Sequence, residues 1–419
     1  MSFTAAAGLV AWAAVLLVSH LVGRVLRGNG MKLFAPPLFG HFDLRLGRSI
    51  VPATIFACMV VFGGRRASHE LSWWAVLVAT GVSAFAWAVL LAYAEGWDAL
   101  SAPLRSPHDY LATASGVGSP SQWLSTFTAR LSSYGVHVQG HPPGMVLALW
   151  IMQRAGIGVF AIALVIVAAG ASAASAALVA LRNLSGEVAA RRAAPFMVLA
   201  PAAVWIATSD DALWLGTSAW GIAALTVAAA RRDAKGHVAA LVGGGLLGGS
   251  LFLSYGVVPL GAVVVSVGLY RRRWLPLVSA GVAVVAVGVL FWSFGFSWFD
   301  GLAATAERYA AGVSRHRPFA YFALANLAAF SIALGPATAV ALAQLRRRST
   351  WVLVGAALVA VMIADLSGFS KGEVERIWLP FVPWVLMSTS TLDGAPARGL
   401  LGLQALTGLA VQVGTRTPW

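Results

Sequence analysis

The stretch SWWAVLVATGVSAFAWAVLLAY, residues 72–93, contains no charged side chain. It matches the roughly 20 consecutive apolar residues that one helix needs to cross a bilayer. Several other apolar runs are shorter, so some are expected to be broken or re-entrant. These runs lie at 5–26, 49–63, 158–181, 194–207, 213–230, 237–253, 257–270, 275–294, 319–343, 351–366, 377–390 and 399–413. The chain is therefore expected to be all-α, a polytopic integral membrane protein with about 11–13 transmembrane helices.

The overall composition supports the same class. Of the 419 residues, 59% are hydrophobic and 11% are charged, and the mean hydropathy is +0.80. Soluble domains carry about 25% charged residues, which an aqueous surface requires. A disulfide scaffold is excluded because Cys58 is the single cysteine of the sequence. We expect a multi-pass protein of the plasma membrane.

The basic residues mark the expected cytoplasmic side. The chain has 29 Lys and Arg and a formal net charge of +14. Clusters of such residues in short loops between apolar runs typically face the cytoplasm. A nucleic-acid surface would need them on one face with aromatic residues among them, and no such pattern exists, so no nucleic-acid partner is expected. The clusters are Arg65 with Arg66, Arg182 with Arg191 and Arg192, Arg231 and Arg232 with Lys235, Arg271 with Arg272 and Arg273, and Arg346 with Arg347 and Arg348.

This orientation places the polar segments 94–143, 209–211, 254–256, 295–318 and 367–376 outside. Ten of the 15 acidic residues then share that side: Glu95, Asp98, Asp109, Asp210, Asp211, Asp300, Glu307, Asp365, Glu373 and Glu375. Four of the eight histidines join them, namely His108, His137, His141 and His316. A membrane protein with its polar loops on one face is expected to do its chemistry there.

Residues 24–48 do not fit this scheme. A crossing at 49–63 would place them outside, although they are rich in basic residues: Arg24, Arg27, Lys32, Arg45 and Arg48. Either 49–63 is too short to cross, or the positive-inside rule is broken here. The topology of residues 1–71 stays open, and the side of Asp43 stays open with it.

The longest polar segment, 94–143, is expected to be folded and functional, because structureless loops of this length are uncommon. Its aromatic and leucine residues recur at helical spacing, which predicts two or three short helices on the membrane surface. The segment begins with Glu95, Trp97 and Asp98 at the end of an apolar run. Ionisable residues at a membrane edge are often functional, but ordinary interfacial carboxylates are the plain alternative.

The same segment ends with Gly140-His141-Pro142-Pro143-Gly144. The two prolines restrict the backbone dihedrals after His141, so this side chain is held in a fixed orientation at the start of a helix. A helix start with a capping polar residue is the equally simple interpretation.

In this order, the segments resemble the GT-C superfamily of membrane glycosyltransferases, in particular protein O-mannosyltransferases, lipid A aminoarabinose transferases and related bacterial enzymes. Those enzymes carry an acidic motif in the first outer loop and a later His-Pro-Pro-Leu-like motif, whose fourth residue here is Gly144. An Asp in a short outer turn is matched by Thr208-Ser209-Asp210-Asp211, and a late Glu/Arg/Pro motif by Glu373-Val-Glu375-Arg376-Ile-Trp378-Leu-Pro380. The resemblance covers about residues 72–385, and the Ala/Gly/Arg-rich composition is similar to that of actinobacterial proteins.

The resemblance implies transfer of a sugar from a polyprenyl-phosphate donor to a glycan, lipid or protein acceptor of the cell envelope, with inversion. It also implies a GT-C-like catalytic module at 72–390, between an N-terminal membrane segment at 1–71 and a C-terminal helix at 391–419. The reaction needs a carboxylate as general base, and Glu95 fits that role, with Asp98 and Asp109 as rivals. It also needs an arginine on the leaving phosphate, and Arg376 fits. The other expected substrate-binding residues are Asp98, Asp109, His141, Asp210, Asp211, Arg308, Arg315 and Glu375.

The segment 295–318 carries Arg308, Arg315 and Arg317 on the outer side, against the charge rule. An anionic phosphate or acceptor would explain them, and so would salt bridges with Asp300 and Glu307. No cofactor is expected. A divalent metal held by Asp210, Asp211 and His141 is a weak alternative, because adjacent Asp side chains usually point in different directions.

Two other classes of function stay open. A transporter or lipid-linked-sugar flippase would place ionisable residues at mid-membrane and often shows inverted repeats, neither of which is visible here. A non-catalytic scaffold with a GT-C-like fold would tolerate mutation of Glu95.

Overall fold

The computed structural model describes residues 3–26, 31, 33–207 and 209–417, and almost all of its regular structure is helical. In this part of the chain, eight single helices are long and apolar enough to cross a membrane: α1 (Phe3–Leu26), α2 (Val51–Glu70, preceded by η1, Arg48–Ile50), α3 (Trp73–Tyr93), α8 (Val159–Ser185), α11 (Asp211–Ala230), α12 (Ala234–Leu253), α14 (Leu275–Ser293) and α18 (Arg348–Leu366). The pair α16 (Phe319–Leu334) and α17 (Pro336–Gln344) passes the same test together but is bent by 97°, which is the geometry of a broken span or a re-entrant loop. The predicted all-α, polytopic membrane class is confirmed.

Four of the predicted apolar runs form shorter or interrupted helices, or a helix that is not among these candidate spans. They are α9 (Glu187–Val198) with α10 (Ala203–Ile206), η5 (Tyr255–Leu260) with α13 (Gly261–Arg271), η7 (Leu379–Phe381) with α20 (Val382–Leu386) and η8 (Met387–Thr391), and α21 (Gly394–Gly414). Prolines 195, 201, 259, 380 and 383 lie in the first three, where each lacks a backbone N–H donor; Pro380 and Pro383 stand at the starts of η7 and α20. In the described residues, the helices that are long and apolar enough to cross a membrane number eight, or nine with the bent pair, which is fewer than the 11–13 that the apolar runs predict.

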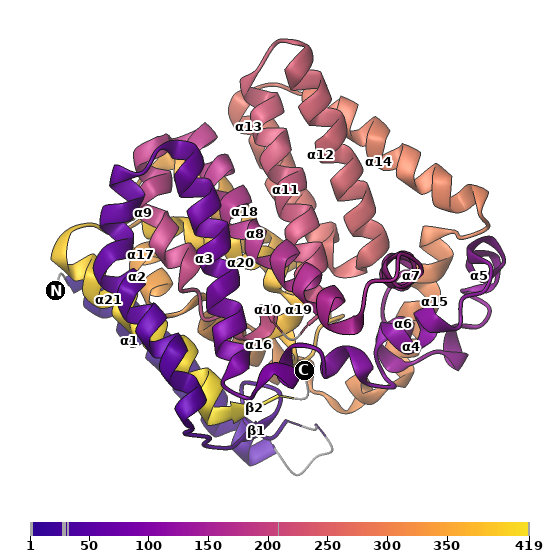
Figure 1. The fold of residues 1–419 in the computed structure, drawn as a ribbon, viewed down its shortest axis with the longest axis horizontal. Helices are drawn as coiled ribbons and strands as arrows, with labels where there is room; N and C mark the ends of the chain where they lie inside the picture. The colour runs from indigo at the N-terminus through magenta and orange to yellow at the C-terminus, as the bar shows by residue number, and fades with distance from the viewer. Residues whose placement is uncertain (1–2, 27–30, 32, 208, 418–419) are drawn as a thin grey trace.

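The arginine clusters lie in or beside the loops between α2 and α3, α8 and α9, α11 and α12, α13 and α14, and α17 and α18, which are at the upper side of Figure 1. Arg65 and Arg192 both pair with Asp393, and Arg182 pairs with Glu187 at 2.8 Å. Arg273 donates to the carbonyl of Ala229 at 3.1 Å, and the hydroxyls of Ser349 and Thr350 bond Ser185, so the clusters near 271 and 347 share this end. The segments predicted to face outward begin or end at the opposite end.

The N-terminal segment lies at that opposite end, with the polar loops. Helix α2 is a full-length pass, so the chain between α1 and α2 emerges beside the end of α3. Strand β1 (His41–Phe42) pairs antiparallel with β2 (Thr415–Arg416), and Asp43 N–H donates to Gly414 O at 3.1 Å. Because α2 is long enough to cross, the alternative that 49–63 is too short does not hold. The basic residues of this segment therefore lie at the same end of the bundle as the polar loops. Arg27 and Lys32 are outside the described residues.

The loop 94–143 is folded into short helical segments, which are more numerous than the predicted two or three. They are η2 (Trp97–Leu100), η3 (Pro103–Arg105), α4 (Tyr110–Ser115), α5 (Pro120–Thr126), η4 (Leu131–Ser133) and α6 (Val136–Gln139), and they lead into α7 (Gly144–Arg154). Its aromatic core includes Trp123, Phe127 and Tyr134. Phe127 contacts Phe296, with ring centroids 5.6 Å apart, which joins the loop to the segment before α15 (Trp298–Ala311) and η6 (Val313–His316). The lower right of Figure 1 shows these helices side by side.

Candidate active site

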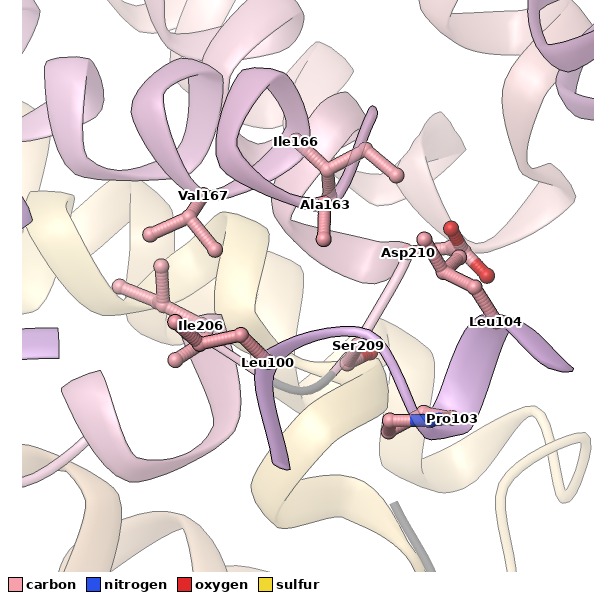
Figure 2. A pocket seen from close by; sticks show the side chains of 10 residues that line it. Leu100, Pro103, Leu104, Ala163, Ile166, Val167, Ile206, Ser209 and Asp210 are labelled. Carbon is pink, nitrogen blue, oxygen red and sulfur yellow. The ribbon is translucent and has the colours of Figure 1, made fainter. Parts of the chain in front are cut away.

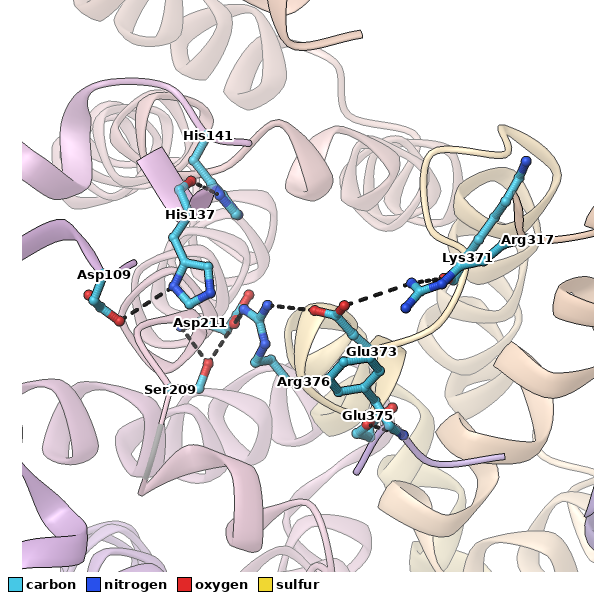
Figure 3. Close-up of polar contacts among 11 residues, drawn as sticks. Asp109, His137, His141, Ser209, Asp211, Arg317, Lys371, Glu373, Glu375 and Arg376 are labelled. Atoms are coloured by element: carbon cyan, nitrogen blue, oxygen red, sulfur yellow. Dashed lines mark hydrogen bonds and ion pairs between the residues drawn. The ribbon is translucent and has the colours of Figure 1, made fainter. Parts of the chain in front are cut away.

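Side chains from four separate segments of the chain come together, as Figure 3 shows. Asp109 precedes α4, and His137 and His141 precede α7. Ser209, Asp210 and Asp211 form the turn that opens α11. Glu373, Glu375 and Arg376 lie at the start of α19 (Val374–Ile377). We call the side chains of Asp109, Asp210, Asp211 and Arg376 the carboxylate–arginine cluster.

Arg376 and Asp211 form a buried ion pair at the centre of the cluster. The Arg376 Nη1 lies 2.5 Å from the Asp211 Oδ2, and both side chains are almost completely buried. The same carboxylate oxygen accepts from the Ser209 hydroxyl at 2.5 Å, and that hydroxyl accepts from the Asp211 N–H at 3.1 Å. Arg376 also reaches Glu373 Oε2 with Nη2, at 3.2 Å. One guanidinium therefore holds two carboxylates, an arrangement that fixes its planar fork in position.

Asp109 and Asp210 form a second buried pair beside it. Asp109 accepts from the Tyr110 N–H at 2.5 Å, and its other oxygen lies 3.4 Å from the His137 Nδ1. Burial raises the pKa of Asp210 well above its usual value, and the hydrogen-bonded Asp109 carboxyl raises it further. The Oδ1 of Asp210 is buried without a hydrogen-bond partner. A buried carboxyl that has a raised pKa and an oxygen without a partner is suited to act as a general acid or base.

His141 is neutral and held in place. Its Nδ1 lies 2.9 Å from the His137 carbonyl oxygen, and its ring packs 5.2 Å from the Trp214 ring and 5.7 Å from the Tyr110 ring, measured between centroids. Burial lowers the pKa of His141 to about 4, so the imidazole carries no charge near neutral pH. The two prolines after His141 thus deliver a neutral ring to the edge of the cluster.

Glu375 is buried but faces another partner. Its Oε1 accepts from the Phe39 N–H at 3.0 Å, and burial raises the pKa of Glu375 to about 7. The next residue, Arg376, points the opposite way, towards Asp211. Glu375 therefore connects the N-terminal segment to α19 and lies apart from Asp109 and Asp210.

Glu95 and Asp98 lie outside the carboxylate–arginine cluster, and both are exposed. Glu95 pairs with Arg45 at 2.6 Å and accepts from the Gln412 side chain at 3.0 Å. The Arg45 N–H and its guanidinium also donate to the carbonyls of Val413 and Thr415. Glu95 thus ties the end of α3 to both terminal segments, a structural arrangement that explains its position without chemistry.

Arg308 and Arg315 are not brought to the carboxylates either. Arg308 donates to the Gln139 side chain, whose amide donates to the Tyr134 carbonyl at 2.5 Å. Arg315 donates to His316 at 2.8 Å and is exposed. Arg308 thus joins the segment 295–318 to the loop 94–143, whereas the contact of Arg315 stays within its own segment.

The expected set of site residues omits Glu373, Arg317, His137 and Tyr110, all of which lie in or beside the cluster. Glu373 has a left-handed backbone (φ 64°) directly after Gly372 (φ 91°), so the Gly-Glu pair was a signal of an unusual turn. In the described residues, no group of three or more His, Cys, Asp or Glu side chains is placed to hold a metal ion, so the weak alternative of a metal at Asp210, Asp211 and His141 gains no support.

A small pocket lies behind Asp210, as Figure 2 shows. Its walls are apolar side chains of η2, η3, α8 and α10, and the polar residues Ser209 and Asp210 lie at one end. The lining is Leu100, Pro103, Leu104, Ala163, Ile166, Val167, Ile206, Ala207, Ser209 and Asp210. A hydrocarbon surface therefore leads to the carboxylate pair.

Comparison with known proteins gives one similarity to report. No family model matches the chain, and no curated protein matches it. Among solved structures, the chain is similar to the crystal structure of ArnT from Cupriavidus metallidurans in the apo state, with 14% sequence identity and a TM-score of 0.41. The match covers 64% of this chain and 54% of that one, so the chain spans about half the length of ArnT. Neither function nor site residues follow from a similarity at this level.

Proposed function

We propose that this protein is a membrane glycosyltransferase that moves a sugar from a polyprenyl-phosphate donor to an extracytoplasmic acceptor. The observation that carries the proposal is the carboxylate–arginine cluster. The His-Pro-Pro, Asp-Asp and Glu/Arg/Pro segments are far apart in sequence, and they converge with Asp109 at one end of the bundle. A base, a phosphate-binding arginine and an apolar surface are the three elements that the reaction requires.

The base in this proposal is the Asp109–Asp210 pair. The acceptor hydroxyl loses its proton to the carboxylate as its oxygen forms a bond to the anomeric carbon of the sugar. The bond from that carbon to the phosphate oxygen breaks, and the lipid phosphate leaves with the electron pair. Attack opposite the leaving group inverts the anomeric configuration. Asp210 suits this role because it is buried, has a raised pKa and keeps one oxygen without a partner. Glu95 is the alternative base, and its salt bridge to Arg45 argues for a structural role.

Arg376 is the proposed ligand of the leaving phosphate. Its guanidinium presents paired donors that match phosphate oxygens, and negative charge develops on the leaving oxygen as the sugar moves away. Asp211 and Ser209 hold that guanidinium in a fixed orientation. The pocket behind Asp210 is lined by apolar side chains but has a volume of only about 10 Å³, room for one water, so a prenyl chain would enter only if those side chains moved apart.

The active site is proposed to face away from the cytoplasm. The basic clusters of the short loops gather at the end of the bundle opposite the carboxylate–arginine cluster. Basic residues in short loops usually stay in the cytoplasm. The acceptor would then be a glycan, lipid or protein of the cell envelope.

The test is to reconstitute the purified protein in liposomes with a panel of polyprenyl-phosphate sugars. The proposal expects one donor to be consumed, with release of polyprenyl phosphate and a product of inverted configuration, as read by NMR of the anomeric proton. If a donor instead crosses the bilayer intact, the protein is a flippase. If no donor is consumed or moved, a scaffold is the better interpretation.

A further inference from the structure

Glu373 lies between two buried arginines. Its Oε2 is 3.2 Å from the Arg376 Nη2, and its Oε1 is 3.7 Å from the Arg317 Nη1. The dashed lines of Figure 3 follow this chain from Arg317 through Glu373 and Arg376 to Asp211. Each arginine side chain is 9% exposed, whereas that of Glu373 is 23% exposed. The carboxylate is thus the part of this group that solvent and ligands can reach most easily.

Arg317 is fixed by contacts that do not involve Glu373. Its guanidinium donates to the carbonyl oxygens of Met31, at 3.1 Å, and Lys371. It also stacks near the Phe39 and Phe322 rings, with centroid distances of 5.6 and 5.5 Å. The cation therefore stays in place whether or not Glu373 is beside it.

The Glu373 backbone is held in a conformation that few residues adopt. A left-handed φ of 64° is unfavourable for a residue with a side chain. Gly372 comes directly before it, and a Cβ at Gly372 would lie 3.2 Å from the Arg317 Nη1. The backbone thus brings the Glu373 carboxylate to the space between the two guanidiniums.

We propose that Arg317 and Arg376 form a binding site for a phosphate group, and that the Glu373 carboxylate occupies this site when no ligand is bound. Two fixed guanidiniums facing one anion are the arrangement that proteins use for phosphate. The carboxylate supplies the negative charge that the phosphate would otherwise supply, and it must move aside when the ligand enters. The identity of the ligand as the donor phosphate rests on the proposed function; the anion site itself does not.

The experiment measures binding of two probes, inorganic phosphate and a polyprenyl monophosphate, to the full-length protein in lipid nanodiscs. Glu373→Gln removes the competing charge, so the affinity for the phosphate group should rise about tenfold, because the binding-competent state is then more populated. Arg317→Gln removes half of the site and should lower the affinity by about tenfold or more. Arg317→Lys, which keeps the charge, should bind with intermediate affinity.

The controls are Glu307→Gln and Arg105→Gln, which change exposed charges at the same end of the bundle. Neither should alter binding by more than about twofold, since exposed charges are screened. If only the lipid probe binds with this pattern, the site belongs to a lipid phosphate. If inorganic phosphate shows the same pattern, the site accepts the phosphate group from either source.

Unchanged affinity of both probes in Glu373→Gln would overturn the proposal, even if Arg317→Gln failed to fold. The outcome is also independent of catalysis. A protein that binds phosphate with the predicted pattern but transfers no sugar would keep the anion site and lose the proposed function.

Discussion

The same kind of side chain has different chemistry at two positions of this protein. Glu95 is exposed, forms a salt bridge with Arg45 and accepts a hydrogen bond from Gln412. Asp210 is buried beside another carboxyl. Burial disfavours the charged form of a carboxyl and so makes it a better proton acceptor near neutral pH. The environment, rather than the residue type, selects the candidate base.

Asp210→Asn should therefore abolish most activity. The amide keeps the size of the side chain but cannot accept a proton, and loss of a general base typically costs about 100- to 10,000-fold in rate. Because the pKa of Asp210 is raised, the wild-type rate should fall on acidification at a higher pH than an ordinary Asp would give. The measurement is kcat/KM against pH in proteoliposomes.

Glu95→Gln is the matched control for that variant. It removes an exposed charge pair, worth about 0–1 kcal/mol, and should leave the transfer rate within about twofold. A dead Glu95→Gln enzyme beside an active Asp210→Asn enzyme would return the role of base to Glu95.

Arg376→Lys should lower the transfer rate by roughly tenfold or more, because an ammonium keeps the charge but loses the paired donors. The fold should survive, since the lysine still faces the Asp211 carboxylate. Thermal unfolding measured in detergent separates the two effects. A Lys variant with wild-type rate would leave Arg376 as a structural residue.

At this scale the sequence could predict which residue types matter but not which of them meet. The sequence names Asp210, Asp211 and Arg376 as candidates, but whether they meet depends on the convergence of distant segments, and the Asp211–Arg376 pair spans 165 residues. The partners of Glu95 include Gln412, 317 residues away, so no local pattern could show that Glu95 was already paired.

Among the helices, the contact between α7 and α12 explains a departure from the resemblance noted in the sequence. The fourth residue of the His-Pro-Pro segment is Gly144, where a Cβ would collide with the backbone carbonyl of Phe252. Glycine lets the start of α7 lie directly on the end of α12. His141, three residues earlier, is positioned by this close contact.

Gly144→Ala should therefore destabilise the protein by about 1–3 kcal/mol, the usual cost of overpacking. Gly140→Ala is the control, because its Cβ would lie 3.6 Å from the nearest atom, the His137 carbonyl oxygen, which is an ordinary contact. The readout is the midpoint of thermal unfolding. Equal midpoints for the two variants would show that α7 can move away from α12 at little cost.

The interrupted passes show where apolar runs were an incomplete guide to the helices. Runs such as 194–207 and 377–390 have the right composition, but they are divided into short helices, with Pro201 between α9 and α10 and with Pro380 and Pro383 at the starts of η7 and α20. Long apolar helices were predictable from composition, whereas the bend between α16 and α17 depends on a left-handed Gly335 (φ 78°) and on packing.

For the whole molecule, the separation of charge between the two ends predicts the topology. In a Cys58→Ser background, single cysteines near Asp210 and Glu373 should react with an impermeant thiol reagent in intact cells, and one near Arg272 should not. Cysteines near the buried cluster can react weakly even if they face outward. A cysteine at Asp98, which is exposed at the same end of the bundle, is therefore the reference position. Labelling beside Arg272 but not beside Asp98 would reverse the orientation of the protein.

The central claim is that the carboxylate–arginine cluster transfers a sugar from a lipid phosphate. Its most direct test is a single-turnover reaction of reconstituted protein with the donor found in the panel, read as release of polyprenyl phosphate by wild type, Asp210→Asn and Glu95→Gln. The account predicts release by wild type and Glu95→Gln, and a rate at least about 100-fold lower in Asp210→Asn. Equal release by the folded Asp210→Asn variant and wild type would contradict it.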